Sequence, residues 1–229
     1  MEVDIVTSEL ESRVRELEEI NTELEARAGR LRSVLEITNL QSRYNLWLEM
    51  GYYERIWDEL FSHDNPQVSC EIGESGVYEG PASVERLWKA LANRERPRGY
   101  MANIMVMNPY IVLSKDGNTA KGMWWAFGPH ADYATPYPGD GQKLTAYWFC
   151  GKYDNRYIKE GGKWKFLSLH TIIYMRTPFD QGWLKQSDCV RWQVPEGAPA
   201  DRPPTLLENY HAGVTPEWKP YVYPYEPII

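Results

Sequence analysis

Cysteine is scarce in this chain, and the cysteines that occur lie far apart. Cys70, Cys150 and Cys189 are odd in number and fit neither a disulfide framework nor a zinc site, so we expect reduced, structural thiols. No apolar run is long enough to cross a bilayer, and the N-terminus is acidic rather than basic and then apolar. The sequence therefore predicts a cytoplasmic protein without a membrane partner.

A basic cluster is also missing. The 25 Lys and Arg residues are outnumbered by 32 Asp and Glu residues, which gives a net charge of −7. Because proteins that bind nucleic acids neutralise phosphates with clustered cations, we expect no nucleic-acid partner.

Several motifs of metal and cofactor chemistry are absent as well. The four histidines lack ligand spacing, and there is neither a phosphate-cradling glycine loop nor a Gly-x-Ser-x-Gly elbow. The sequence therefore predicts no metal and no cofactor. What remains is acid–base chemistry by side chains whose pKa values are tuned by burial.

Aromatic residues, by contrast, are abundant, with 10 Trp and 16 Tyr in 229 residues. They indicate either a large aromatic core or a cavity for a flat aromatic ligand. The length favours a single domain with two extensions.

The first extension, residues 1–35, carries a heptad repeat. Leucine recurs at every seventh position, and the alternate seam positions hold mostly small or apolar residues; the two sets are Leu10, Leu17, Leu24 and Leu31, and Val14, Asn21, Ala28 and Leu35. This pattern predicts a coiled coil, and the single Asn favours a parallel dimer. We therefore expect a homodimer or higher homo-oligomer. The alternative is an amphipathic helix that lies on its own domain.

The middle of the chain alternates helical and strand-like patterns. We expect helices at 36–50, 53–61 and 83–93, and strands at 68–72, 101–113, 119–127 and on both sides of the Gly161-Gly162 turn in a long hairpin over 147–174. Alternation on the second hairpin strand predicts one face that holds Trp164, Phe166, Ser168, His170, Ile172 and Tyr174. A His and a Ser among aromatics indicate either a filled core or a lined pocket.

Three stretches resemble a known superfamily. They are LQSRY at 40–44 with EMG at 49–51 and WDELF at 57–61; VYEG at 77–80; and YIKEGGKWKF at 157–166. Residues 36–176 thereby resemble the nuclear-transport-factor-2-like (NTF2-like) superfamily, in its SnoaL- and scytalone-dehydratase-like branch. The resemblance implies an α+β cone, in which a curved antiparallel sheet wraps around helices and encloses a deep pocket.

The second extension, residues 177–229, is rich in aromatic residues and proline and has little periodicity. We expect an extended path over its own domain or over a neighbouring subunit. The alternative is a disordered tail.

Candidate catalytic residues follow from the resemblance and from the face pattern. His130 in Gly128-Pro129-His130 resembles an active-site histidine of scytalone dehydratase, and Glu49 matches an acidic position of that family. His170 shares a mixed sheet face, and Tyr44 lies about one turn before Glu49. We expect these four side chains to converge on one apolar pocket. The expected substrate contacts are Asn103, Phe149, Tyr153, Trp47, Tyr174 and Trp125.

The residue types and the resemblance together imply a cofactor-independent lyase that acts on an aromatic small molecule. The extensions look like those of aromatic-catabolism members, including lyases that release formaldehyde from lignin-derived diarylpropane diols and give stilbenes. Alternatives are a dehydratase, isomerase or cyclase on a polyketide- or steroid-like substrate, a non-catalytic ligand-binding or scaffolding dimer, and a small subunit beside a ring-hydroxylating oxygenase.

Overall fold

The computed structural model describes residues 2–94, 96, 98–133, 144–185, 195 and 197–205, with side chains from residue 7 onward. The helical elements are α1 (Glu2–Met50), α2 (Tyr53–Arg55), η1 (Ile56–Leu60), η2 (Gly73–Ser75) and α3 (Pro81–Ala92). The strands are β1 (Ser69–Ile72), β2 (Val77–Glu79), β3 (Met101–Ala102), β4 (Met105–Leu113), β5 (Thr119–Tyr133), β6 (Leu144–Glu160) and β7 (Lys163–Pro178).

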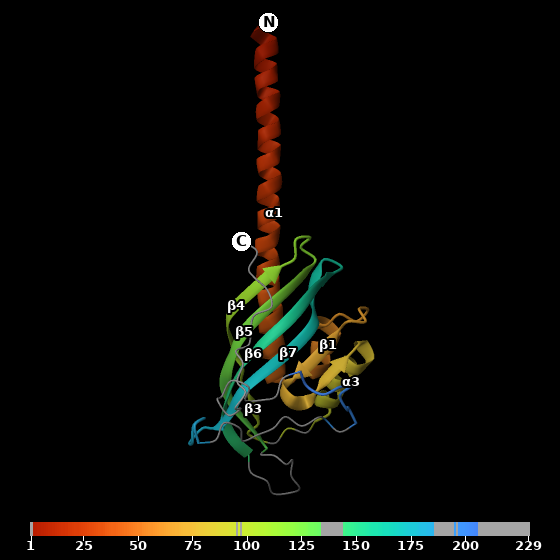
Figure 1. Cartoon of the computed structure of the whole chain (residues 1–229), viewed down its shortest axis with the longest axis vertical. Coiled ribbons are helices and arrows are strands. Elements are labelled where there is room, and N and C mark those ends of the chain that lie inside the picture. Colours follow the sequence, from red (N-terminus) through yellow and green to blue (C-terminus); the bar gives the residue numbers. More distant parts are fainter. Residues whose placement is uncertain are drawn as a thin grey trace.

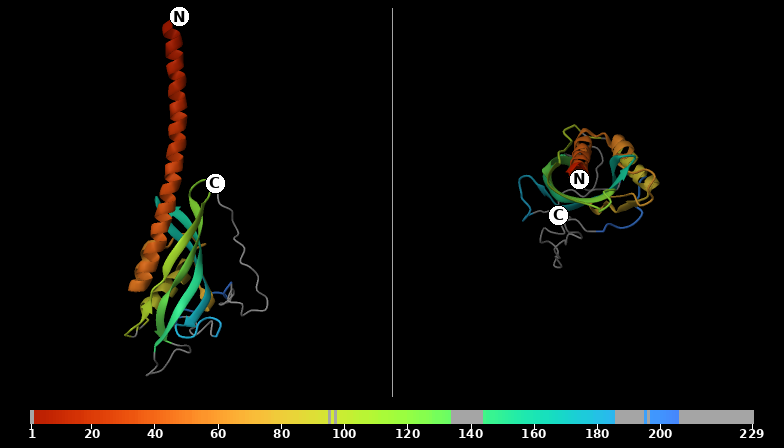
Figure 2. Two further views of the ribbon diagram at one scale, coloured as in Figure 1. Left: turned by 90° about the vertical axis from the view of Figure 1, so that its left-hand side faces the viewer. Right: turned by 90° about the horizontal axis from the view of Figure 1, so that it is seen from above.

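The strands form one curved, unclosed sheet in the order β2-β1-β7-β6-β5-β3, and β4 also pairs with β5. All neighbours are antiparallel except β1 and β7, which run parallel. Seen from above, the sheet curves around the lower part of α1, and the shorter helices complete the enclosure (Figure 2). This mixed α+β arrangement is the NTF2-like cone that the sequence predicts.

The long hairpin is confirmed, with its turn at Gly161 and Gly162. Both glycines have positive φ angles, 54° and 77°, which residues with a Cβ rarely adopt. Glu160 pairs with Lys163 directly across this turn. The hairpin is the longest part of the sheet and forms its centre.

Strict alternation along β7 is wrong, because the strand contains two irregularities. Phe166 pairs with Tyr157 whereas Ser168 pairs with Arg156, so one extra residue on β7 reverses the side-chain direction. As a result Phe166 faces α1 in the core, while Ser168 and His170 face the outer side of the sheet. A second shift follows at Tyr174, between the pairs of Ile173 and Met175.

Helix α1 is continuous from an exposed stalk into the domain (Figure 1). Leu10 on the stalk is 61% exposed and Leu31, just below the stalk, is 68% exposed, whereas Ile37 is fully buried inside the cone. The helix enters the domain at Arg30, whose guanidinium donates to the carbonyl oxygens of Leu113 and Ser114 in the β4–β5 turn, at 3.4 and 3.1 Å. Coiled-coil pairing of the stalk stays a prediction.

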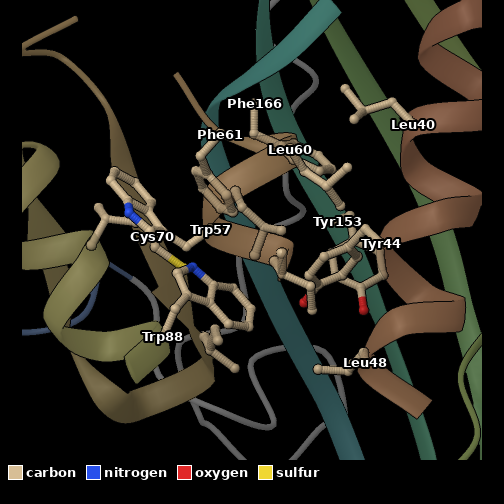
Figure 3. Packing of buried hydrophobic residues seen from close by; sticks show 14 of the residues in the cluster. Leu40, Tyr44, Leu48, Trp57, Leu60, Phe61, Cys70, Trp88, Tyr153 and Phe166 are labelled. Atoms are coloured by element: carbon tan, nitrogen blue, oxygen red, sulfur yellow. The ribbon is translucent and has the colours of Figure 1, made fainter. Parts of the chain in front are cut away.

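Aromatic side chains fill the cone beside the lower part of α1 (Figure 3). The ring of Tyr44 meets those of Trp88, Tyr153 and Phe166 edge-on, with centroids 6.0, 5.7 and 5.6 Å apart. Such pairs add about 0.5–1.5 kcal/mol each beyond their buried area. At this level the aromatic residues form a packed core.

Residues 197–205 of the C-terminal extension are bound to the domain. The carboxylate of Asp201 accepts hydrogen bonds from the Ser83 hydroxyl and, at 2.8 Å, from the backbone N–H of Glu79. The hydroxyl of Tyr78 donates to the Ala198 carbonyl at 2.7 Å. Cys189 and the expected path of residues 206–229 lie outside the described residues. None of the helices described here is long and apolar enough to cross a membrane.

Candidate active site

His130 lies on the inner face of the sheet, near the end of β5. It pairs with Tyr147 on β6, and its ring centroid is 5.2 Å from those of Tyr147 and Phe149. Its Nδ1 is 3.5 Å from the Gly128 carbonyl oxygen, and only 8% of the residue is exposed. The imidazole is therefore held against an aromatic wall.

This environment keeps His130 neutral. Burial lowers the pKa of His130 to about 4, because the charged form loses its hydration. The bond to the Gly128 carbonyl opposes this shift, and the positive charge of Arg176 adds to it. Near pH 7 the imidazole is therefore unprotonated and able to accept a proton.

Arg176 is a functional candidate that the sequence reasoning missed. It pairs with Phe149 on the inner face and is 4% exposed. The expected domain boundary fell at this residue, but β7 continues to Pro178. The sequence signal that could have identified Arg176 is a cation that follows the mostly apolar stretch Thr171–Tyr174.

A partly buried ion pair lies close to His130. The Arg94 guanidinium donates to both carboxylate oxygens of Asp132, at 2.8 and 2.9 Å. Asp132 lies two residues after His130 on the same strand and therefore on the same face. Burial raises the pKa of Tyr100, and the Tyr53 hydroxyl 3.4 Å away and the Asp132 charge add to the shift. This end of the inner face thus combines charged, phenolic and imidazole groups.

A buried network of neutral polar groups lies deeper in the cone. Gln41 donates to Asn45 at 2.9 Å and accepts from Asn155 and Tyr157 at 2.8 and 3.1 Å. Asn45 in turn donates to the Tyr153 hydroxyl at 3.1 Å. Each of these residues is at most 6% exposed, so the network ties α1 to β6 out of contact with bulk water.

The tyrosines of this region remain protonated. Burial raises the pKa of Tyr44 well above its ordinary value, and the nearby Tyr153 raises it further. Burial likewise raises the pKa of Tyr153, while hydrogen bonds from Asn45 and Tyr44 oppose the shift. At neutral pH both phenols are hydrogen-bond donors and not bases, so the imidazole of His130 is the better base.

The structure does not bring His170 to His130, and their expected convergence on one pocket is wrong. The β-bulge near Leu167 turns His170 to the outer face, where its Nε2 is 3.6 Å from the Glu71 carboxylate. Glu71 also accepts hydrogen bonds from the backbone and hydroxyl of Thr205, at 2.5 and 2.8 Å. His170 thus contributes to the attachment of the C-terminal segment.

Two further candidates, one acidic and one aromatic, lie at the end of α1. Glu49 is exposed, so its carboxylate is solvated. Trp47 is half-buried, with the Arg55 guanidinium 4.3 Å from its ring centroid. Trp47 packs against the hydrophobic core from its edge.

Trp125 and Tyr174 meet on the outer face, where their rings pack edge-on at 5.7 Å. The ammonium of Lys152 lies 4.2 and 5.5 Å from their ring centroids. Trp125 and Lys152 also line an apolar groove of about 280 Å³ together with Asn108, Tyr110, Met123 and Trp124. These two aromatics therefore lie on the opposite face of the sheet from His130.

Asn103 lies next to the His130 strand through its backbone. Its N–H donates to the Pro129 carbonyl at 3.3 Å. A Cβ at Gly128 would lie 1.8 Å from the Asn103 carbonyl oxygen, so glycine is required for this close approach. Among the described residues, no group of three or more His, Cys, Asp or Glu side chains could hold a metal ion.

Similar solved structures share the fold. The chain resembles "Putative Scytalone Dehydratase" from Novosphingobium aromaticivorans with a TM-score of 0.53 and 18% identity, covering 74% of this chain and 97% of the other. A hexachlorocyclohexane dehydrochlorinase, LinA-type3 from Novosphingobium barchaimii, matches with a TM-score of 0.51 and 16% identity over 68% of this chain and 95% of the other.

No curated protein matches the chain in sequence. The family model of the SnoaL-like domain, however, matches residues 29–170, which include His130, the aromatic core and the buried amide network. This match covers more than half of the chain and agrees with the curved, unclosed sheet. The chain therefore belongs to the SnoaL-like domain family.

Proposed function

We propose that this protein is a cofactor-independent lyase that acts on an aromatic small molecule, with His130 as the general base. The observation that carries the proposal is the neutral imidazole of His130, held against the rings of Tyr147 and Phe149 on the inner face beside the buried Arg176. Because this pKa lies below 7, the imidazole is in the unprotonated form that a general base requires at neutral pH.

The substrate class that we propose is a diarylpropane 1,3-diol derived from lignin. His130 takes the proton of the terminal hydroxyl, and the bond between the terminal carbon and the central carbon breaks to release formaldehyde. The electron pair of that bond forms the central double bond of a stilbene, while the benzylic hydroxyl leaves as water after it gains a proton. The sum is diol to stilbene, formaldehyde and water, without an oxidant or a reductant.

In this proposal Arg176 and the aromatic wall bind and orient the substrate. A buried guanidinium stabilises a phenolate or a developing alkoxide better than it does in water, because the surroundings screen the charge weakly. Tyr147 and Phe149 offer ring faces against which an aryl group can stack. The ion pair of Arg94 with Asp132 holds the adjoining wall in place.

A dehydratase is the second candidate, since the same base supports elimination of water from a neighbouring carbon. Two of the similar folds are described as a dehydratase and a dehydrochlorinase, which are eliminating enzymes by name. In that case the proton comes from carbon, the hydroxyl leaves as water, and no formaldehyde forms.

The test is incubation of the purified full chain with diarylpropane diols, hydroxylated polyketide intermediates and steroids. We expect stilbene absorbance to rise in step with formaldehyde, one to one. His130→Gln should lower kcat by about 10²–10⁴-fold. The matched variant His170→Gln, on the outer face, should turn over the diol at close to the wild-type rate.

Loss of water from a substrate without release of formaldehyde would contradict the lyase proposal and support the dehydratase. If the protein bound these compounds but converted none of them, it would be a ligand-binding protein, and both enzymatic proposals would be contradicted. If His130→Gln kept the wild-type rate with a confirmed substrate, the imidazole would not be the base.

A further inference from the structure

The stalk formed by residues 7–29 of α1 presents a leucine seam that its own domain does not cover. Leu10, Leu17 and Leu24 are 61%, 50% and 57% exposed, and the side chains around them are exposed as well. Exposed leucines in strict heptad spacing are costly in water and are the pattern that a partner helix covers. In proteins, most of the stability of a helix comes from the packing of one face against a partner.

The seam points away from the cone at the place where α1 enters it. At about 100° per residue, Leu31 and Leu35 point roughly 150° away from Ile37 and Tyr44. The exposures agree, because Leu31 and Leu35 are 68% and 65% exposed whereas Ile37 and Tyr44 are buried. The side of α1 that carries the seam therefore stays open to a second helix down to residue 35.

The charges beside the seam favour one orientation of a second copy. One flank carries Glu11, Glu18 and Glu25, and the other carries Arg13 and Arg27. In a parallel pair, the glutamate flank of one helix faces the arginine flank of the other. In an antiparallel pair, each flank faces the same flank of the second copy, so that glutamate meets glutamate and arginine meets arginine. In the parallel pair, Arg13 meets Glu18 of the second copy.

The same alignment brings one like-charged pair, Arg27 with Arg32 of the second copy. Arg27 is already bonded to Glu23 on its own helix, at 2.5 Å, which reduces this repulsion. Asn21 lies at a central seam position and meets its own copy only in the parallel, in-register arrangement, where the two amides can bond.

We propose that the stalk and the adjoining residues 30–35 are the contact surface for a second copy of this chain, and that they form a parallel, in-register, two-stranded coiled coil over residues 10–35. The pairing places both cones at the same end of the coil. It is independent of the proposed enzyme activity, because it uses none of the side chains of the inner face.

Disulfide formation between introduced cysteines tests both the pairing and its direction. In the full chain, Val14→Cys and Ala28→Cys should each give a disulfide-linked dimer under mild oxidation, because both positions face their own copies in the parallel coil. An antiparallel pair can bring at most one position close to itself. Ser12→Cys, on the outer side of the helix, and the unmodified chain are the controls and should stay unlinked.

A second set of variants ties the cross-link to the seam. Leu17→Asp with Leu24→Asp should abolish the linkage at Val14→Cys, whereas Ser12→Asp with Ala26→Asp adds the same charges on the outer side and should keep it. Linkage at both positions that depends on the leucines supports the proposal. Linkage at neither position or at only one, or linkage that survives the leucine changes, overturns it.

Discussion

Gln41 on α1 and Asn155 on β6 are fully buried and joined by a 2.8 Å hydrogen bond from the asparagine amide to the glutamine carbonyl. The carbonyl oxygen of the Asn155 side chain also accepts the backbone N–H of His170, at 3.0 Å. The Asn155 side chain therefore links α1, β6 and β7. It does so where the hydrogen-bond register between β6 and β7 is irregular. The buried network stabilises the cone through contacts that packing alone does not supply.

Gln41→Leu should lower the free energy of unfolding by about 1–3 kcal/mol, because Asn155 and Tyr157 then lose a buried partner. Urea unfolding followed by tryptophan fluorescence measures the change. Gln67→Leu makes the same chemical change at an exposed side chain and should stay within about 0.5 kcal/mol of wild type. Equal effects of the two variants would contradict a structural role for the network.

Gly29→Ala should stabilise the stalk by about 0.5–1 kcal/mol, because glycine in a helix has more conformational freedom to lose on folding. A Cβ at this position meets no atom within 4 Å. The matched change Gly117→Ala also has open space, but the φ angle of +71° strains a residue with a Cβ. Circular dichroism melting should therefore move upward for Gly29→Ala and downward for Gly117→Ala.

Acid should destabilise the domain through His130. Its pKa falls from 6.5 to about 4 on folding, so the unfolded chain binds more protons between these values. The contribution of His130 to the free energy of unfolding is therefore fully present above pH 6.5 and is lost as the pH falls towards 4. Between pH 7 and pH 5 the free energy of unfolding should fall by about 2 kcal/mol through this group. Burial lowers the pKa of His170 as well, and that histidine acts in the same direction.

Urea unfolding at pH 7 and pH 5 measures this loss. His130→Gln, which cannot titrate, should show a smaller drop between the two pH values than wild type. An identical drop in both proteins would show that the imidazole is not kept neutral by burial.

Asp201→Ala should loosen the C-terminal segment. Its carboxylate holds the Ser83 hydroxyl and the Glu79 amide, and it pairs with Arg86 at 3.3 Å, so its loss should cost about 1–2 kcal/mol. Limited proteolysis should cut the variant faster within 197–205 than it cuts wild type. Asp180→Ala, at an exposed carboxylate, provides the comparison; equal cutting of the two variants would contradict the anchoring role.

The elements that rest on local patterns could be predicted from the sequence. The glycine turn at 161–162, the long strands around it and the helix through Tyr44 follow from turn chemistry and periodicity. The fold class follows from the motifs of the family. These signals act between residues that are close in the chain, so a single sequence contains them.

The arrangement of the site depends on two irregularities that the sequence does not show. Alternation placed His170 with Phe166 on one face, but a single extra residue in β7 separates them. The pairing of β1 with β7 brings Glu71 opposite His170 and so gives this histidine a structural partner. Bulges and parallel pairing arise from contacts far apart in sequence, which explains why Arg176 was missed and His170 was overvalued.

The unbroken path of α1 makes the stalk a spacer of defined length. From Arg30 back to Thr7 the helix covers about 35 Å at about 1.5 Å per residue, and the carbonyl oxygens of the β4–β5 turn hold its base. A label or a fused protein at the N-terminus would thus be carried at a set height above the cone, on the side opposite His130. Bending the stalk near Arg30 would in turn pull on Gln41 and Tyr44, which are positioned by the same helix.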